Sequence, residues 1–154
     1  MAKVKKRRRG TAIVETEKGI LVTAGRGGVF LLPGGGANRG ETRIEAAMRE
    51  LREETGLKPY YAKYLFRHTG KVHKSHGHGY FQDHHTVCLI KAHGAPPNPR
   101  HEIKHIAFYK PGSGVRISRV TREIIEKYYS YKKRGKAKQR QVSLINRISE
   151  WLGF

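Results

Sequence analysis

One segment, residues 42–56, constrains the fold of this chain more than any other part of its sequence. Apolar or small side chains recur in it three and four residues apart: Ile44, Ala47, Met48, Leu51 and Thr55. This spacing is typical of one face of an α-helix. Thr42, with Glu45 three residues later, forms a capping-box pattern, and Gly56 is a common residue just beyond a helix end. The sequence therefore predicts an amphipathic helix here, with one face in a core.

Three glutamates lie on one side of this predicted helix, next to its apolar face. Glu50, Glu53 and Glu54 occupy positions i, i+3 and i+4, so their carboxylates project together. Like charges at this spacing destabilise a bare helix by roughly 0.2–0.5 kcal/mol per pair. A divalent cation such as Mg²⁺ or Mn²⁺ would offset the repulsion and complete its coordination with substrate phosphates. The alternative is a solvated helix face with ion pairs, such as Arg49 with Glu53.

A glycine-rich turn precedes the helix. Gly34, Gly35 and Gly36 enter a loop that ends at Glu41, directly before the helix. Glycine lets the backbone approach a ligand closely and leaves its amides and carbonyls available to a metal or a phosphate. We therefore expect the turn and the three carboxylates to share one site that acts on a phosphate compound.

Together, the turn and the helix resemble the box motif of the Nudix family. The matching positions are Gly35, Glu41, Arg49-Glu50-Leu51, Glu53-Glu54 and Gly56-Leu57. Because all nine specified positions over 23 residues agree, chance is a poor explanation. The resemblance implies a Nudix-type α/β/α sandwich with a central mixed β-sheet, extending over roughly residues 10–131.

The resemblance also implies an activity, that of an Mg²⁺-dependent pyrophosphohydrolase that cleaves a nucleoside diphosphate linked to another moiety. It implies four metal ligands: Glu50, Glu53, Glu54 and the carbonyl of Gly35. Arg49 would orient the neighbouring glutamates, and Glu41 would support the loop or a second metal. In metal-assisted phosphoryl transfer, cations neutralise the phosphate oxygens and lower the pKa of a bound water, which attacks phosphorus in line.

The general base is less fixed in this family, where it is either a box glutamate or a carboxylate from a downstream loop. Glu102 is the downstream candidate, because it follows a loop directly before the last predicted strand. Asp83 is the one other acidic residue between Glu54 and Glu123. The alternative for Glu102 is an ordinary charge at the edge of a loop.

Substrate contacts are predicted from residue type and position. The candidates are Arg26, Gly34, Gly36, Glu41, Tyr80 and Phe81. Arg26 is a candidate for a phosphate or ribose on charge alone. Tyr80 and Phe81 lie where a loop meets a strand, and exposed aromatic rings there would stack on a nucleobase. Packing in the core is the alternative for these two rings.

Short β-prone stretches surround the predicted helix. They cover residues 10–16, 20–24, 29–32, 60–68, 84–92 and 103–109. The first three suggest an antiparallel meander that ends at Pro33-Gly34-Gly35-Gly36. The His-rich connection between 68 and 84 is expected to be irregular, and residues 96–99 to form a loop. With a second helix predicted over 118–131, the pattern indicates an α/β layered domain with a mixed sheet.

The chain is strongly basic, with 32 Lys and Arg against 12 Asp and Glu and a formal charge of +20. Like-charge repulsion predicts an extended, solvated arm over residues 1–9. A Nudix domain over 10–131 and a basic hinge with an amphipathic helix over 132–154 would follow. This charge attracts polyanions, so two rival functions stay open. One is a hydrolase of dinucleoside polyphosphates, diphosphoinositol polyphosphates or RNA 5′ ends; the other is a non-catalytic RNA-binding module.

Several other functions are disfavoured by the sequence. The nine histidines between His68 and His105 have no cysteine partners and fit no structural zinc spacing. A solvated loop, or one that contacts phosphates, suits them better. Cys88, the single cysteine, is expected to be a small buried hydrophobe. Apolar runs fall short of the roughly 20 residues of a membrane span, and a cytoplasmic location is expected. The apolar stripe at 142–152 is a candidate homodimer element.

Overall fold

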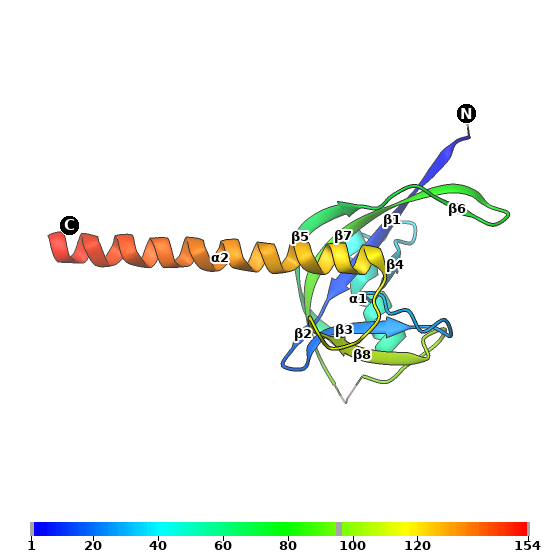
Figure 1. The fold of residues 1–154 in the computed structure, drawn as a ribbon, viewed down its shortest axis with the longest axis horizontal. Helices are drawn as coiled ribbons and strands as arrows, with labels where there is room; N and C mark the ends of the chain where they lie inside the picture. Colours follow the sequence, from blue (N-terminus) through cyan, green and yellow to red (C-terminus); the bar gives the residue numbers. More distant parts are fainter. Residues whose placement is uncertain (1, 95–96, 154) are drawn as a thin grey trace. The chain divides into compact units, whose positions relative to one another are not determined.

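The main sheet of the protein has five strands and is mixed (Figure 1). The computed structural model describes residues 2–94 and 97–153. The sheet contains β1 (Val4–Ile13), β4 (Gly34–Gly36), β5 (Lys58–Thr69), β6 (His73–Ser75) and β7 (Gly79–His93). Its order is β4-β1-β7-β5, and β6 pairs with β7. β1 runs parallel to β7 and the other pairs are antiparallel, which confirms the predicted α/β class with a mixed sheet.

A smaller antiparallel sheet contains β2 (Glu15–Thr16), β3 (Gly19–Ala24) and β8 (His105–Tyr109) in the order β2-β3-β8. Every residue of β3 is buried. Thr23 of β3 also forms an isolated bridge with Leu31, in the segment that connects β3 to the glycine-rich turn.

The predicted helix is confirmed as α1 (Arg43–Thr55). The Thr42 hydroxyl accepts a hydrogen bond from the Glu45 amide (3.1 Å), and the Glu45 carboxylate accepts one from the Thr42 amide (2.8 Å). Gly56 ends the helix in the left-handed conformation, with φ of 75°. Both ends were identifiable because they depend on side chains within a few residues of each other.

The core that positions α1 lies between this helix and the main sheet. Ala47 and Leu51 of α1 are packed with Ala12 of β1 and with Cys88 and Ile90 of β7. Cys88 is fully buried, as expected, and burial raises the pKa of its thiol to about 11. At Gly10 the helix comes so close that a Cβ would collide with the Arg43 carbonyl oxygen. A side chain at Gly10 would therefore push the first turn of α1 off the sheet.

The amino-terminal segment differs from the predicted arm, because residues 4–9 belong to β1. The strand pairs in register with β7 from Val4 to Ile13. Arg7 forms a salt bridge with Asp83 (Nε to Oδ1, 2.6 Å), and its guanidinium lies 5.0 Å from the centre of the Phe81 ring. Ladder hydrogen bonds and these cross-strand contacts compensate the charge repulsion on which the prediction rested.

Three other expectations are wrong in local structure. Residues 34–36 do not end strand character but form β4, since they pair with Arg9, Gly10 and Thr11 of β1. Residues 29–32 contribute isolated bridges instead of a full strand. The His-rich connection is not irregular throughout, because β6 pairs with the start of β7. Of the predicted loop at 96–99, residues 97–99 are irregular and Pro96 lies outside the described residues.

The carboxy-terminal helix, α2 (Arg119–Leu152), is continuous over 34 residues. The hinge expected at 132–140 is helical, because Lys, Arg, Gln and Ala are strong helix formers and outweigh the single Gly135. Contacts divide the chain into two compact units, residues 1–121 and 122–154. Neither helix, over the ranges the structure describes, contains a stretch long and apolar enough to cross a membrane.

Candidate active site

Arg49 is the most highly connected side chain of the predicted site. Its guanidinium donates to both carboxylate oxygens of Glu41, from Nε (2.8 Å) and from Nη2 (3.0 Å). This bidentate contact holds the pKa of Glu41 below its ordinary value and raises the pKa of Arg49. The Glu41 carboxylate also accepts a hydrogen bond from the Asn38 amide (3.0 Å). The loop before α1 is thereby fixed to the middle of the helix.

The same guanidinium reaches two of the three predicted metal ligands. Nη1 donates to Glu50 (3.0 Å) and to Glu53 (3.1 Å), and Nη2 donates to the carbonyl oxygen of Gly36 (3.1 Å). Arg49 therefore bonds to both of its glutamate neighbours, and its role in orienting them for a metal stays a prediction. It also offsets part of the like-charge repulsion that the sequence alone assigned to a cation.

Glu54 is the buried carboxylate of the site, with 6% of its surface exposed. It accepts a hydrogen bond from the Thr23 hydroxyl of β3 (3.3 Å) and another from the Gly34 amide of β4. Burial, together with the nearby charges of Glu50 and Glu102, raises its pKa to about 8. At neutral pH this carboxyl group therefore retains a proton unless a cation takes its place.

The glycine-rich turn lies against the glutamates, as the sequence predicts. Gly35 pairs with Gly10 in the ladder between β4 and β1. A Cβ on Gly35 would collide with the carboxylate of Glu50. A side chain at Gly35 would therefore force the Glu50 carboxylate to move away from the turn.

The donor set suits a hard divalent cation by its chemistry. Glu50, Glu53 and Glu54 supply carboxylate oxygens, and Glu54 among them is buried. Within residues 2–94 and 97–153, no three acidic, histidine or cysteine side chains are already arranged as a metal site. The carboxylates of Glu50 and Glu53 form salt bridges with Arg49.

The structure brings Glu102 into electrostatic reach of Glu54. The loop that carries it is fastened to the site from both sides. Backbone amides of Asn98 and Arg100 donate to the carbonyl oxygens of Thr55 (2.9 Å) and Glu54 (3.0 Å), and the Lys104 amide donates to Ala24 (2.9 Å). Glu102 itself is exposed, so its carboxylate is accessible to water.

The structure does not bring Tyr80 and Phe81 to the glutamates. In the β1–β7 ladder Tyr80 pairs with Val4, six positions before the Gly10–Thr86 pair. At the rise of an extended strand this is a separation of roughly 20 Å. Their rings lie beside Lys74 and Arg7. Arg26 lies exposed in the turn after β3.

Sequence reasoning missed Thr23, which bonds to Glu54. It is the one polar side chain in the buried strand β3, and a polar residue in an apolar run was the signal that could have identified it.

Comparisons with known proteins agree with this geometry. The NUDIX domain family model matches residues 5–128. A structure from Chromobacterium violaceum, described as a nudix hydrolase family member, is 35% identical with a TM-score of 0.71, covering 96% of this chain and 98% of that one. A MutT NUDIX hydrolase from Burkholderia pseudomallei is 22% identical (TM-score 0.64), with 79% and 97% covered.

A dihydroneopterin triphosphate pyrophosphohydrolase from E. coli is 19% identical, with a TM-score of 0.62 and coverage of 82% of this chain and 97% of that one. At this identity, and at that of the Burkholderia protein, the likeness shows the fold. A search of curated proteins finds no match.

Proposed function

The chain belongs to the Nudix family of hydrolases, which act on phosphoric anhydride bonds, and from this premise we propose that it is a pyrophosphohydrolase dependent on Mg²⁺ or Mn²⁺. The proposed substrate is a nucleoside diphosphate linked to another moiety, with a nucleoside triphosphate as the leading candidate. The observation that carries the proposal is the close approach of Gly35 to Glu50, one of three glutamates whose carboxylates bond to Arg49.

Glu50, Glu53, Glu54 and the carbonyl of Gly35 are the proposed metal ligands. When bound, the metal neutralises phosphate oxygens and lowers the pKa of a coordinated water. Glu54 would exchange its proton for the cation, because the charge that burial disfavours would then be paired. Arg49 keeps Glu50 and Glu53 on the side of the helix that faces the turn. Glu41 in turn fixes Arg49, so these two residues position the ligands.

The proposed general base is Glu53 or Glu102. The Glu53 side chain is 46% exposed, far more than the 17% of Glu50, so water reaches it directly. Glu102 is exposed on a loop whose backbone is bonded to the end of α1. Either carboxylate can take the proton that the attacking water loses.

Product analysis after incubation with Mg²⁺ tests this function. We would offer nucleoside triphosphates, nucleoside diphosphate derivatives, dinucleoside polyphosphates and inositol pyrophosphates in ¹⁸O-labelled water, which marks the phosphorus that is attacked. Arg52→Gln is the matched control for Glu53→Gln, because Arg52 is exposed on the same helix. The proposal would be refuted if the protein left every one of these anhydrides intact with Mg²⁺ and also with Mn²⁺.

The charge of +20 supports a second candidate, a hydrolase of highly anionic polyphosphates. The same screen separates the two by the ratio of kcat/KM between polyphosphate and nucleoside triphosphate substrates. RNA affinity measured in EDTA, together with no turnover of any substrate in Mg²⁺, would favour the RNA-binding module instead. Use of the 142–152 stripe in a homodimer and a cytoplasmic location stay predictions.

A further inference from the structure

A second group of polar residues lies on the face of the main sheet that α1 covers. In the ladders, His84 of β7 is flanked by Arg8 of β1 and Thr69 of β5. One row closer to the helix, Thr86 is flanked by Gly10 and Arg67. Residues two apart along a strand share a face, and Gly10 faces α1. Arg8, His84 and Arg67 therefore lie on that same face, beyond the first turn of the helix.

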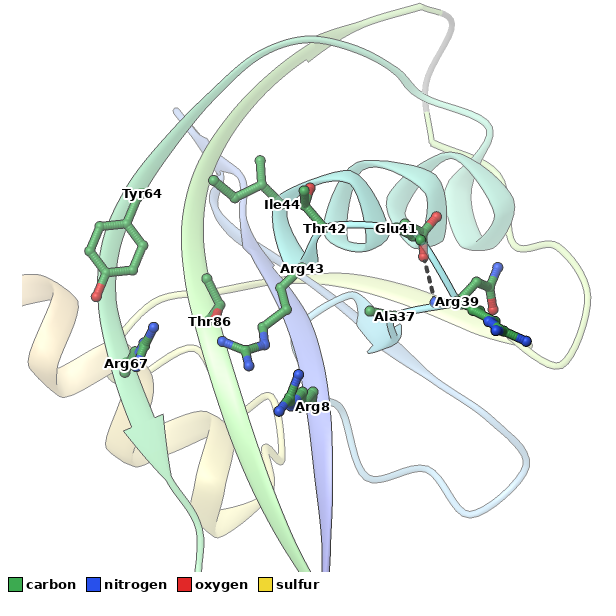
Figure 2. A pocket seen from close by; sticks show the side chains of 12 residues that line it. Arg8, Ala37, Arg39, Glu41, Thr42, Arg43, Ile44, Tyr64, Arg67 and Thr86 are labelled. Carbon is green, nitrogen blue, oxygen red and sulfur yellow. Dashed lines mark hydrogen bonds between the residues drawn. The ribbon is translucent and has the colours of Figure 1, made fainter.

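Two adjoining cavities open over these rows. One, of about 580 Å³, is lined by the loop before α1 and by the sheet. The other, of about 210 Å³, lies farther along the strands. Both are lined by Arg8, Arg43, Arg67 and Thr86. Figure 2 shows Arg43 extending from the start of α1 over β7, with its guanidinium between Arg8 on β1 and Arg67 on β5.

The positive charge in these cavities is uncompensated. Among the residues that the structure describes, the smaller cavity is lined by four cationic side chains, Lys6, Arg8, Arg43 and Arg67, and by no acidic one. In the larger one the acidic residue is Glu41, whose two oxygens are already bonded to Arg49. Over the described ranges, Arg8, Arg43 and Arg67 form no salt bridge. Four cations gathered without a counterion repel one another, so an anion placed among them would be stabilised.

A buried nitrogen points to the same place. His84, which lines the smaller cavity, has its Nδ1 next to the Thr69 hydroxyl (3.4 Å). Its Nε2 is buried and has no hydrogen-bond partner among the described residues. Buried polar atoms in native proteins are nearly always paired. An oxyanion held by the neighbouring guanidinium groups would accept a hydrogen bond from this nitrogen.

We propose that Arg8, Arg43, Arg67 and His84 form a second anion site, which binds a phosphate group of a small, multiply charged phosphate compound. Guanidinium groups suit this ligand because their planar N–H donors pair with two phosphate oxygens at once. Arg43 precedes Glu53 by ten residues on α1, which corresponds to about 15 Å along the helix axis. The second site is therefore separate from the glutamate cluster and goes beyond the proposed function.

Isothermal titration calorimetry with inorganic tripolyphosphate tests the site. The full chain is titrated in EDTA at fixed salt, so no metal bridges the ligand to the glutamates and the result is independent of turnover. We expect Arg67→Gln and Arg43→Gln each to weaken binding roughly tenfold, the effect of losing a charged hydrogen bond. The matched control, Arg116→Gln, is exposed and outside both cavities, and should stay within about twofold of the parent.

A second measurement follows the histidine itself. The ¹⁵N resonance of His84 Nε2 should shift when tripolyphosphate is added to the parent protein and should not shift in Arg67→Gln. The proposal is overturned if the parent does not bind tripolyphosphate, or if the control loses as much affinity as the two variants. It is also overturned if the variants weaken binding of a 5′-phosphorylated oligonucleotide but not of tripolyphosphate, because the arginines would then bind a nucleic-acid backbone.

Discussion

Glu54 combines two properties that oppose each other in the metal-free protein, a buried position and an ionisable group. Its pKa of about 8 lies above the ordinary value of 4.5, so the folded chain holds this proton more tightly than the unfolded chain. The stability that this group contributes is therefore complete below pH 4.5 and is lost as the pH rises through about 8. At alkaline pH the ionised, buried Glu54 therefore lowers the stability of the folded protein, and a bound cation would remove this effect.

Replacing Glu54 with glutamine should remove that pH dependence, because the amide cannot ionise. In EDTA we expect Glu54→Gln to match the parent near pH 4.5 and to be more stable above pH 8. Each tenfold change in proton affinity is worth about 1.4 kcal/mol, so the gain should be on the order of a few kcal/mol. Urea unfolding across this pH range measures it. Glu53→Gln, at an exposed position, is the control, and an equal gain there would assign the effect to net charge.

Turnover should respond in the opposite way to the same substitutions. Glu53→Gln and Glu54→Gln are expected to lower kcat by orders of magnitude with Mg²⁺, since each removes a proposed metal ligand. In EDTA at alkaline pH, the thermal midpoint should be unchanged for Glu53→Gln and higher for Glu54→Gln. Stopped assays for pyrophosphate release from a nucleoside triphosphate at saturating substrate give kcat. A variant with the parent's turnover would remove that glutamate from the mechanism.

Arg49 tests whether orientation of the ligands matters apart from charge. Arg49→Lys keeps the positive charge but cannot bond Glu41, Glu50 and Glu53 at once, because an ammonium lacks the planar fork. We expect kcat to fall by roughly 10-fold to 100-fold, with a smaller change in KM. Raising the Mg²⁺ concentration should recover part of the loss. Full activity of the lysine variant would show that charge alone is sufficient.

At the scale of elements, α1 and β4 show which parts of this site could be predicted. The bounds of α1 follow from Thr42, Glu45 and Gly56, which act within one turn of the chain. β4 could not be predicted, because three glycines have no strand propensity and become a strand only by pairing with β1. The spacing along α1 identified Glu50, Glu53 and Glu54, because residues on one helix lie close together in sequence. It could not identify Thr23, or the sheet face that carries Arg8 and Arg67, because these positions depend on how the strands pair.

Because Gly35 of β4 lies against Glu50 of α1, adding a single methyl group at Gly35 should lower activity strongly. Gly35→Ala would place a methyl group against the Glu50 carboxylate and so displace that ligand. We expect kcat with Mg²⁺ to fall at least about tenfold, while circular dichroism shows the same helix content. Gly36→Ala is the matched control, since a Cβ there meets no atom within 4 Å. Equal activity of the two variants would contradict the close contact between turn and helix.

At the scale of the whole molecule, the basic amino terminus is not the solvated arm that its charge predicts but the first part of β1, which pairs with β7. Charge runs usually stay solvated because nothing compensates them. Here β7 supplies both backbone partners and Asp83, a contact between residues 76 positions apart. No local pattern at residues 4–9 carries this information, so its discovery required the tertiary structure.

Deleting residues 2–8 distinguishes a strand from an arm. The deletion would remove five register pairs of β1 with β7, from Val4 to Arg8, together with the Arg7–Asp83 salt bridge. It would also leave Asp83, whose side chain is 19% exposed, without its guanidinium partner. We therefore expect the free energy of unfolding to fall by roughly 2–4 kcal/mol, measured by urea denaturation. Lys3→Gln combined with Lys5→Gln, which lowers the charge and keeps the strand, should change it by less than about 0.5 kcal/mol. If the deletion were as stable as this control, the segment would behave as an arm in solution.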